Sequence, residues 1–294
     1  MQENIPSVAV IGFGEVGPIF AQALGARGCA VAVYDIKLDD PAAAALIRDK
    51  AERAGARVAG SLADCLRGPQ WVFSAVTASQ AGIVARDAAA HLETGQTFID
   101  LNSVSPKAKQ DNCAHIEAAG ADYVESAVMA PVPPQGVRVP MLLGGRRARE
   151  LSPALNAMGM RTEAVADEVG LASAIKLCRS IMIKGTEALC VQSMQAALHF
   201  GVDRRVLASL AASFPGVGWD KGYEAYLIGR VAEHGQRRSE EMREAAAMLE
   251  ELGQDSGLAT AIADVHQAFA RRGRGWLGEM DDRGSLPAWR RLLA

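Results

Sequence analysis

Short apolar runs alternate with longer segments of helical periodicity over the first 168 residues. Alternation of this kind is typical of a parallel sheet whose strands are joined by crossover helices. The pattern therefore predicts an α/β fold with a doubly wound sheet. The strands are expected at 7–11, 30–34, 57–59, 71–76, 97–101, 121–126 and 139–143, and the helices at 19–24, 41–54, 61–64 onward, 81–91 and 107–119.

The pattern changes near residue 168, beyond which no strand is predicted. Residues 168–200 repeat apolar positions at helical spacing without a convincing break, so one long helix is expected there, with apolar residues on more than one side. We therefore predict a Rossmann domain at 1–168 and an all-helical domain for substrate binding and dimerisation at 169–294. Further helices are expected at 204–213, 223–233, 239–252 and 257–271.

The first strand is followed directly by Gly12-Phe13-Gly14-Glu15-Val16-Gly17, then by a helix and a second strand that ends on Asp35. Strand, G-x-G-x-x-G, helix, strand and acidic residue form the dinucleotide-binding fingerprint. Gly12 permits the turn, Gly14 leaves room for a pyrophosphate, and Gly17 permits close helix packing. The alternative is a glycine-rich turn that binds nothing.

Asp35 is expected to bind ribose hydroxyls and to repel a 2′-phosphate, which favours NAD, whereas nearby Lys37 would accommodate NADP. Ligands of doubly wound sheets lie at the carboxyl ends of the strands. The residues that follow the predicted strands at this edge are Val76, Thr77, Asn102 and Ser103. We expect them to line one crevice with the glycine turn.

Charge and cysteine content narrow the possible partners. The net charge of −3 gives no basic footprint for nucleic acid. No apolar run approaches the roughly 18 residues that span a bilayer, so no membrane association is expected. The five cysteines form no C-x-x-C pair, which favours reduced thiols in a cytoplasmic protein, and no histidine pattern indicates a metal site.

Lys176 lies in an apolar stretch of the long predicted helix, where a charged side chain is unusual. It is either a general acid/base whose pKa falls toward ~7–8 through burial or a neighbouring cation, or a side chain that extends to solvent. Ser180 is one turn further along and either faces the same site or bonds to its own helix. Lys184 either lowers the Lys176 pKa, binds an anion or is a solvated charge, and Arg237-Arg238 either reach a substrate carboxylate or phosphate or are solvated.

Three motifs together resemble the β-hydroxyacid dehydrogenases, the group that includes 3-hydroxyisobutyrate and 6-phosphogluconate dehydrogenases. They are the glycine run at 12–17, the segment 123–131 with its sequel Gly144-Gly145, and Gly170-Leu171-Ala172-Ser173-Ala174-Ile175-Lys176. The helical part, with 218–221 and 234–238, resembles a poorly characterised branch of this superfamily with a divergent C-terminal domain.

The resemblance implies an NAD(P)-dependent dehydrogenase that acts on an anionic β-hydroxyacid, with Lys176 as general acid/base, and a homodimer. It also implies nicotinamide or substrate contacts at Ser103 and substrate contacts at Met129 and Ser180. Two elements depart from the family: Met129, Ala130 and Pro131 replace Ser-Gly-Gly, and Ser180 replaces Asn. An imine reductase on the same fold and a dinucleotide-binding protein without turnover therefore stay open as alternatives.

Overall fold

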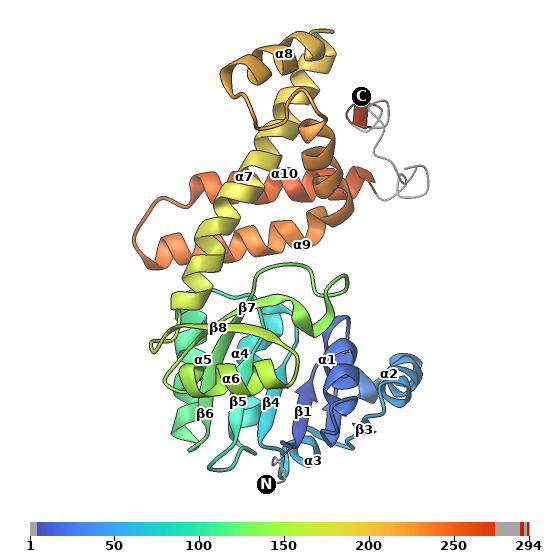
Figure 1. Cartoon of the computed structure of the whole chain (residues 1–294), viewed down its shortest axis with the longest axis vertical. Coiled ribbons are helices and arrows are strands. Elements are labelled where there is room, and N and C mark those ends of the chain that lie inside the picture. The colour runs from blue at the N-terminus through green and yellow to red at the C-terminus, as the bar shows by residue number, and fades with distance from the viewer. Residues whose placement is uncertain (1–4, 274–288, 291–292, 294) are drawn as a thin grey trace. The chain divides into compact units, whose positions relative to one another are not determined.

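The structure is a computed structural model that describes residues 5–273, 289–290 and 293 (Figure 1). The chain divides into two compact units, residues 1–176 and 177–294. The boundary lies inside helix α7 (Leu171–His199), which begins in the first unit and continues in the second.

The first unit is built on one eight-stranded sheet in the order β3-β2-β1-β4-β5-β6-β7-β8. β1 pairs with both β2 and β4 in parallel, so the order reverses beside β1, where doubly wound sheets bind their ligands. This confirms the predicted fold class. The strands are β1 (Val8–Ile11), β2 (Val31–Tyr34), β3 (Arg57–Val58), β4 (Trp71–Ser74), β5 (Thr97–Asp100), β6 (Asp122–Val128), β7 (Pro140–Gly144) and β8 (Arg161–Ala166).

The expectation of a parallel arrangement throughout is wrong for β7, which pairs antiparallel with β6. A parallel pair needs a long crossover, usually a helix, and only the short 3₁₀ turn Gly136–Arg138 lies between these two strands. Two elements were also missed, helix α6 (Ala148–Ala157) and β8. Pro153 lies inside α6 and obscures its helical pattern in the sequence.

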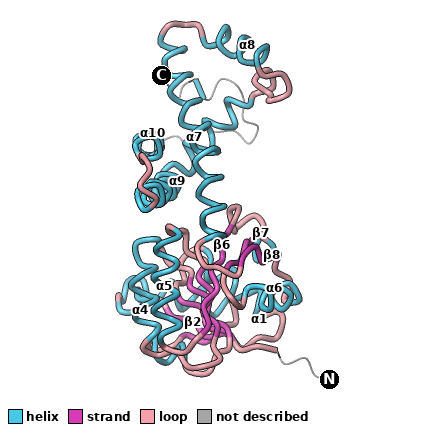
Figure 2. Tube along the Cα trace, turned by 90° about the vertical axis from the view of Figure 1, so that its left-hand side faces the viewer, coloured by secondary structure: helices cyan, strands magenta, loops and turns pink. Residues whose placement is uncertain are grey.

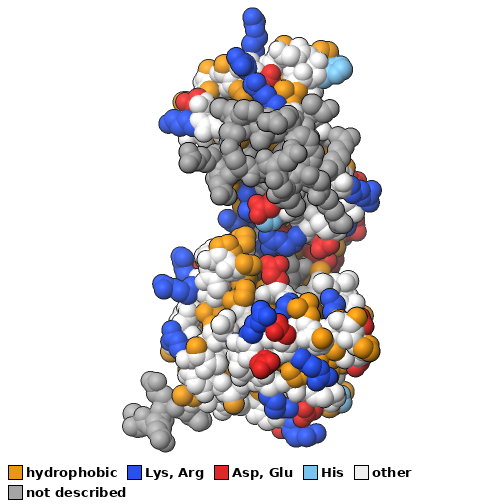
Figure 3. Space-filling view, turned by 90° about the vertical axis from the view of Figure 1, so that its right-hand side faces the viewer, with side chains coloured by type: hydrophobic (Ala, Val, Ile, Leu, Met, Phe, Trp, Pro, Cys, Tyr) orange, Lys and Arg blue, Asp and Glu red, His pale blue; other side chains and the backbone are white. Residues whose placement is uncertain are grey.

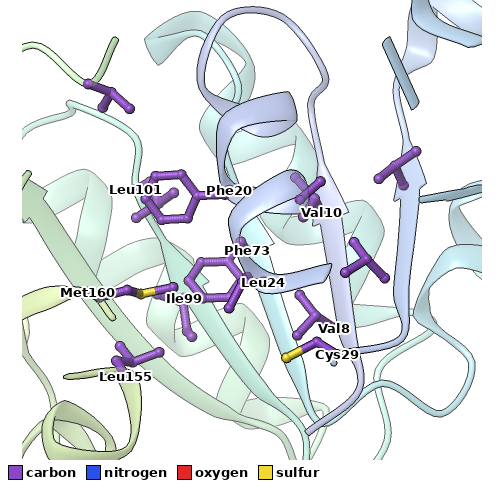
Figure 4. Close-up of a cluster of buried hydrophobic side chains, with 14 of the residues drawn as sticks. Val8, Val10, Phe20, Leu24, Cys29, Phe73, Ile99, Leu101, Leu155 and Met160 are labelled. Carbon is purple, nitrogen blue, oxygen red and sulfur yellow. The ribbon is translucent and has the colours of Figure 1, made fainter. Parts of the chain in front are cut away.

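Helices cover both faces of this sheet. Figure 2 shows α4 and α5 on one side of the strands and α1 and α6 on the other. Phe20 of α1 packs on Phe73 of β4 with ring centroids 5.6 Å apart, within the apolar core in Figure 4. The helices are α1 (Val16–Gly25), α2 (Pro41–Arg53), α3 (Leu62–Leu66), α4 (Ala78–Ala89), α5 (Pro106–Ala118) and α6.

The second unit is helical in all of its described residues apart from connecting turns. After α7 come α8 (Asp203–Ser213), α9 (Tyr223–Glu251) and α10 (Gly257–Gly273). The sequence predicted two helices where α9 is one, because its middle carries glycine and charged residues. Gly235 is needed there for close packing, since a Cβ at this position would lie 2.6 Å from the His266 carbonyl oxygen of α10.

No helix among the described residues is long and apolar enough to cross a bilayer. On the face shown in Figure 3, basic and acidic side chains are interspersed over the unit formed by residues 1–176. That face therefore carries charges of both signs rather than one extended basic patch.

Candidate functional site: a dinucleotide cradle and a lysine-bearing helix

The turn between β1 and α1 uses its three glycines for different purposes. Gly12 has φ +89°, and a Cβ on it would lie 2.5 Å from the Ala75 carbonyl oxygen. A Cβ on Gly17 would lie 2.1 Å from the Gly12 carbonyl oxygen. A Cβ on Gly14 would meet no described atom within 4 Å. Gly12 and Gly17 are therefore required by packing, whereas Gly14 leaves an open space beside the backbone at the start of α1.

Asp35, at the end of β2, is bound to this turn. Its Oδ2 accepts a hydrogen bond from the Phe13 N–H at 2.7 Å, and its Oδ1 accepts one from the Lys37 N–H at 2.9 Å. Each carboxylate oxygen keeps further lone pairs for another donor. The Phe13 side chain is buried in the core, so only the backbone of this residue faces the turn.

A cavity of about 400 Å³ opens between the ends of β1 and β2 and helix α4. Gly12, Asp35 and Val76 line it, together with Asp87 and His91 of the α4 region. The structure thus joins three of the predicted site residues around one cavity. Asp87 and His91 were missed, because an exposed acid on α4 and an exposed histidine in the turn after it carry no local signal.

Asn102 holds the ends of β4 and β5 together. Its Oδ1 accepts a hydrogen bond from the Val76 N–H at 2.7 Å, and its Nδ2 donates to Ser74 Oγ at 3.0 Å. Thr77 follows directly and contacts Ser79 at 3.2 Å between hydroxyl oxygens. Ser103 Oγ is a buried atom without a hydrogen-bond partner among the described residues. The strand-end residues are therefore fixed in place, with one hydroxyl left for another partner.

Met129 follows β6, and its N–H donates to the Pro140 carbonyl oxygen at 2.9 Å. It is partly buried and begins the loop that leads to β7. The Met129 backbone is therefore held by the antiparallel β6–β7 pair.

Lys176 lies in the second turn of α7 and is partly buried. The first turn of α7 is anchored by Glu125 of β6, whose carboxylate accepts a hydrogen bond from the Gly170 N–H at 2.6 Å. Glu125 was missed as a candidate, since the contact joins residues 45 positions apart. The sequence indicated Glu125 only through the segment 123–131, which resembles the β-hydroxyacid dehydrogenases.

Lys50 of α2 was also missed. Its Nζ donates a 2.8 Å hydrogen bond to the Gly14 carbonyl oxygen, which brings a cation to the glycine turn. No spacing rule of the fingerprint indicates this lysine, because it comes from the next helix along the chain.

Ser180 and Lys184 form a pair on α7, since Lys184 Nζ donates to Ser180 Oγ at 2.9 Å. Lys184 also lies 2.6 Å from Glu241 and is only 6% exposed, so the solvated alternative is wrong for it. Burial lowers the Lys184 pKa. The solvated alternative is also wrong for Arg238, which is buried in the middle of α9 and lies 2.7 Å from Glu187.

The residues present fit a dinucleotide. The turn offers open space at Gly14 and leads into the N-terminus of α1, where helices present unpaired N–H groups to an anion. Gly12 and the carboxylate-bearing Asp35 line the cavity. Within the described part of the chain, no group of three His, Cys, Asp or Glu residues is placed to hold a metal ion.

Comparison with known families gives the same result. Residues 7–167 match the family described as the NAD binding domain of 6-phosphogluconate dehydrogenase. The chain belongs to this family. Residues 197–269 also match a domain of unknown function, DUF1932. The predicted membership in the β-hydroxyacid dehydrogenase superfamily, in a branch with a divergent helical domain, is confirmed.

Members of this fold group with solved structures extend over almost the whole chain. A conserved hypothetical protein from Sinorhizobium meliloti is 36% identical, with 99% of this chain and 97% of that one covered and a TM-score of 0.83. A conserved protein of unknown function, described as structurally similar to 3-hydroxyacid dehydrogenases, is 30% identical, with 89% and 96% covered and a TM-score of 0.71.

More distant structures share the fold alone. Mycobacterium tuberculosis 3-hydroxyisobutyrate dehydrogenase with L-serine is 16% identical, with 98% of each chain covered and a TM-score of 0.74. A reductive aminase from Aspergillus terreus in complex with NADPH4, cyclohexanone and allyl amine is 16% identical, with 92% and 95% covered and a TM-score of 0.57.

Proposed function

We propose that this protein is an NAD(P)-dependent oxidoreductase that transfers a hydride between nicotinamide and the carbinol carbon of a β-hydroxyacid. The observation that carries the proposal is that one compact unit contains both the fitted dinucleotide cradle and Lys176. Membership in the 6-phosphogluconate dehydrogenase NAD-binding family supports the cofactor class. A dehydrogenase needs both a bound nicotinamide and a group that moves the hydroxyl proton.

In this proposal the backbone of Gly12, Phe13, Gly14, Glu15, Val16 and Gly17 binds the pyrophosphate at the start of α1. Asp35 accepts hydrogen bonds from the ribose hydroxyls. Val76, Thr77 and Ser103 contact the nicotinamide end, and the unpartnered Ser103 hydroxyl supplies a polar contact there. The bound cofactor supplies the hydride acceptor or donor.

Lys176 acts as the general acid/base. Its neutral amine takes the proton of the substrate hydroxyl during oxidation, and its ammonium returns a proton during reduction. Ser103, Met129 and Ser180 are proposed to contact an anionic substrate. Because the apolar Met129 replaces a serine of the family, a substrate with a more apolar body than the usual small hydroxyacids is expected.

The test is absorbance of reduced nicotinamide with 3-hydroxyisobutyrate, L-serine and 6-phosphogluconate, each with NAD and with NADP. In Lys176→Ala, we expect kcat to fall by about 10²–10⁴-fold while the cofactor Kd stays unchanged. Lys107→Ala, at an exposed site on α5, is the matched control. Turnover that survives in Lys176→Ala contradicts the proposed role. Tight cofactor binding without turnover on any substrate favours a dinucleotide-binding protein instead.

The proposed cofactor preference is for NAD. Asp35 is held by two backbone N–H groups, so its carboxylate stays where a 2′-phosphate would lie, and like charges repel. Fluorescence titration with NADH and NADPH measures the preference. Asp35→Asn is expected to narrow the ratio of the two Kd values by about tenfold, which is about 1.4 kcal/mol, and an unchanged ratio contradicts the assignment.

A second candidate reaction is reduction of an imine. It is favoured by the loss of the Ser-Gly-Gly and Asn elements and by the shared fold of the reductive aminase. A cyclic imine with NADPH tests it directly. Turnover of the imine that exceeds turnover of every hydroxyacid would replace the dehydrogenase proposal.

The proposed assembly is a homodimer. Ile175, Cys178, Met182 and Leu189 follow a three-and-four spacing along one stripe of α7, and all are exposed. An apolar stripe of this kind favours packing against a second helix. Light scattering of Met182→Glu/Leu189→Glu is expected to report a monomer, and a dimer in that variant would contradict this interface. We also assign the protein to the cytoplasm, because its five cysteines are all unpaired.

A further inference from the structure

Glu125 is a fully buried acidic residue of the first unit, and its carboxylate accepts hydrogen bonds from the start of α7. Oε1 accepts from the Gly170 N–H at 2.6 Å and the Ala172 N–H at 3.1 Å. Oε2 accepts from the Ser173 N–H at 3.2 Å and from Ser173 Oγ at 2.6 Å. One side chain of β6 therefore binds four donors at the N-terminus of the helix that carries Lys176.

The chemistry of a helix end explains why this site suits a carboxylate. The first N–H groups of a helix have no partner within the helix, and they carry a partial positive charge. A buried carboxylate is costly unless it is fully hydrogen-bonded. Glu125 and the start of α7 satisfy each other, although 45 to 48 residues separate them in the chain.

The backbone around Glu125 is shaped to admit this side chain. A Cβ on Gly144 of the neighbouring strand β7 would lie 2.4 Å from Glu125 Oε1. Gly144 pairs directly with Glu125 in the β6–β7 ladder. The glycine of the Gly144-Gly145 motif therefore clears the space in which the carboxylate meets the helix.

Lys176 lies on the anchored face of α7. Ala172 and Ser173 precede it by four and three residues, and side chains at these spacings occupy the same face of a helix. The carboxylate accepts hydrogen bonds from Gly170, which precedes α7, and from Ala172 and Ser173 in its first turn. These hydrogen bonds fix both the axial position and the rotation of the first turn of α7. They thereby set the direction of the side chains in the second turn, where Lys176 lies.

We propose that Glu125 is a positioning residue that aims Lys176 through the N-terminus of α7, an inference that rests on the proposed role of Lys176. Glu125 acts through the helix and touches neither substrate nor cofactor. A displacement of about 1 Å at a reacting group can cost about 10²-fold in rate. Replacing the carboxylate with an amide also turns one acceptor into a donor that faces the Ser173 N–H.

The experiment compares Glu125→Gln, Glu125→Asp and Gly144→Ala with the wild type. Glu163→Gln, at an exposed position of β8, is the matched control. Lysines are ¹³C-methylated, and the Lys176 resonance is assigned by its loss in Lys176→Arg. Its chemical shift is followed against pH in the cofactor-free protein. Kinetics use 3-hydroxyisobutyrate with NAD as the probe pair, and circular dichroism confirms folding of each variant.

In Glu125→Gln we expect kcat to fall about 10–100-fold, with the KM for NAD changed less than about twofold. The Lys176 resonance shifts, and the midpoint of its titration moves to lower pH, because loss of a nearby negative charge disfavours the ammonium. The rising limb of kcat for oxidation moves to lower pH with it. Glu125→Asp restores part of kcat, Gly144→Ala reproduces the loss without changing charge, and Glu163→Gln behaves as the wild type.

A folded Glu125→Gln protein with the wild-type Lys176 resonance, titration and pH profile overturns the positioning role. The proposed function fails separately if Lys176→Ala keeps its turnover, whatever Glu125 does. The resonance reports on Lys176 without substrate, so the positioning role is tested even if 3-hydroxyisobutyrate is not turned over.

Discussion

Each of the two units buries a group of charged residues, and the two groups are built differently. In the first unit, Asp100 and Lys109 form an ion pair at 2.9 Å, with exposures of 1% and 0%. Asp100 also accepts from Tyr123 OH at 2.7 Å and from Asn112 Nδ2 at 3.2 Å. Lys109 donates to the Asp100 carbonyl oxygen as well. We call these four residues the Asp100 cluster.

In the second unit, the Glu187 cluster comprises Lys184, Glu187, Arg238, Glu241 and His266. Lys184 pairs with Glu241, and Arg238 pairs with Glu187. His266 Nε2 lies 3.1 Å from the Lys184 carbonyl oxygen. Among the described residues, Arg238 Nε and His266 Nδ1 have no hydrogen-bond partner.

The difference concerns how completely buried polar atoms are satisfied. The Asp100 carboxylate is paired with the other members of the Asp100 cluster and with the Asn102 N–H, so it holds one geometry at the carboxyl edge of the sheet. The Glu187 cluster leaves buried polar atoms unpaired, so its energy depends more on protonation. The first cluster should therefore be sensitive to substitution and the second to acid.

Lys109→Met should have the largest effect on stability. It leaves Asp100 buried without its cation, and breaking such a pair costs about 3–5 kcal/mol. Urea denaturation measures this loss, with Lys107→Met at a half-exposed position of the same helix as the control. A loss below about 1 kcal/mol in Lys109→Met would mean that the Asp100–Lys109 pair contributes no more than an exposed ion pair. The proposed difference between the Asp100 and Glu187 clusters would then not hold.

Acid should next weaken the second unit through His266. Burial lowers its pKa from 6.5 to about 4. Between these values the unfolded chain binds a proton that the folded chain does not, so stability falls as pH drops from about 6.5 to about 4. The full displacement corresponds to about 3 kcal/mol.

Glu187 acts in the opposite sense, because burial raises its pKa and acid then favours the folded state. Lys184, Arg238 and Glu241 complete the charged surroundings of His266. Urea denaturation at pH 7 and pH 5 measures how the unfolding free energy changes with pH. His266→Gln should reduce the change in unfolding free energy between pH 7 and pH 5, whereas His115→Gln, at an exposed position, should retain it. An equal change in both variants would refute the assignment to His266.

Tyr123→Phe should cost about 1.5–2 kcal/mol, because it removes a hydrogen bond to the buried Asp100 carboxylate. Burial raises the Tyr123 pKa well above its usual value, so the hydroxyl stays a donor at every working pH. Thermal unfolding gives the difference, and Tyr226→Phe at a 60% exposed position is the control. Equal stability of the two variants would show that Asp100 does not need this donor.

Arg149→Ala should have the smallest effect, below about 0.5 kcal/mol. Arg149 and Asp167 lie 2.8 Å apart, but their side chains are 73% and 61% exposed. Urea denaturation beside Lys109→Met compares an exposed pair with a buried one at nearly the same distance. Similar losses in the two variants would mean that pairing, rather than burial, determines the energy.

The sequence alone determined the dinucleotide-binding part of this protein. Strand, glycine turn, helix, strand and Asp35 were all predicted, because each is specified by residues close together in the chain. Lys176 was singled out in the same way, as a charge within an apolar helical stretch.

Only the tertiary structure decided the rest. The antiparallel β7, the continuous α9, the burial of Lys184 and Arg238 and the grip of Glu125 on α7 all depend on partners in other elements. Local periodicity records which face of an element is apolar, but it does not record which distant donor will satisfy a buried charge. The sequence thus determines where the glycine turn and Lys176 lie along the chain, and long-range hydrogen bonds decide how the start of α7 is held.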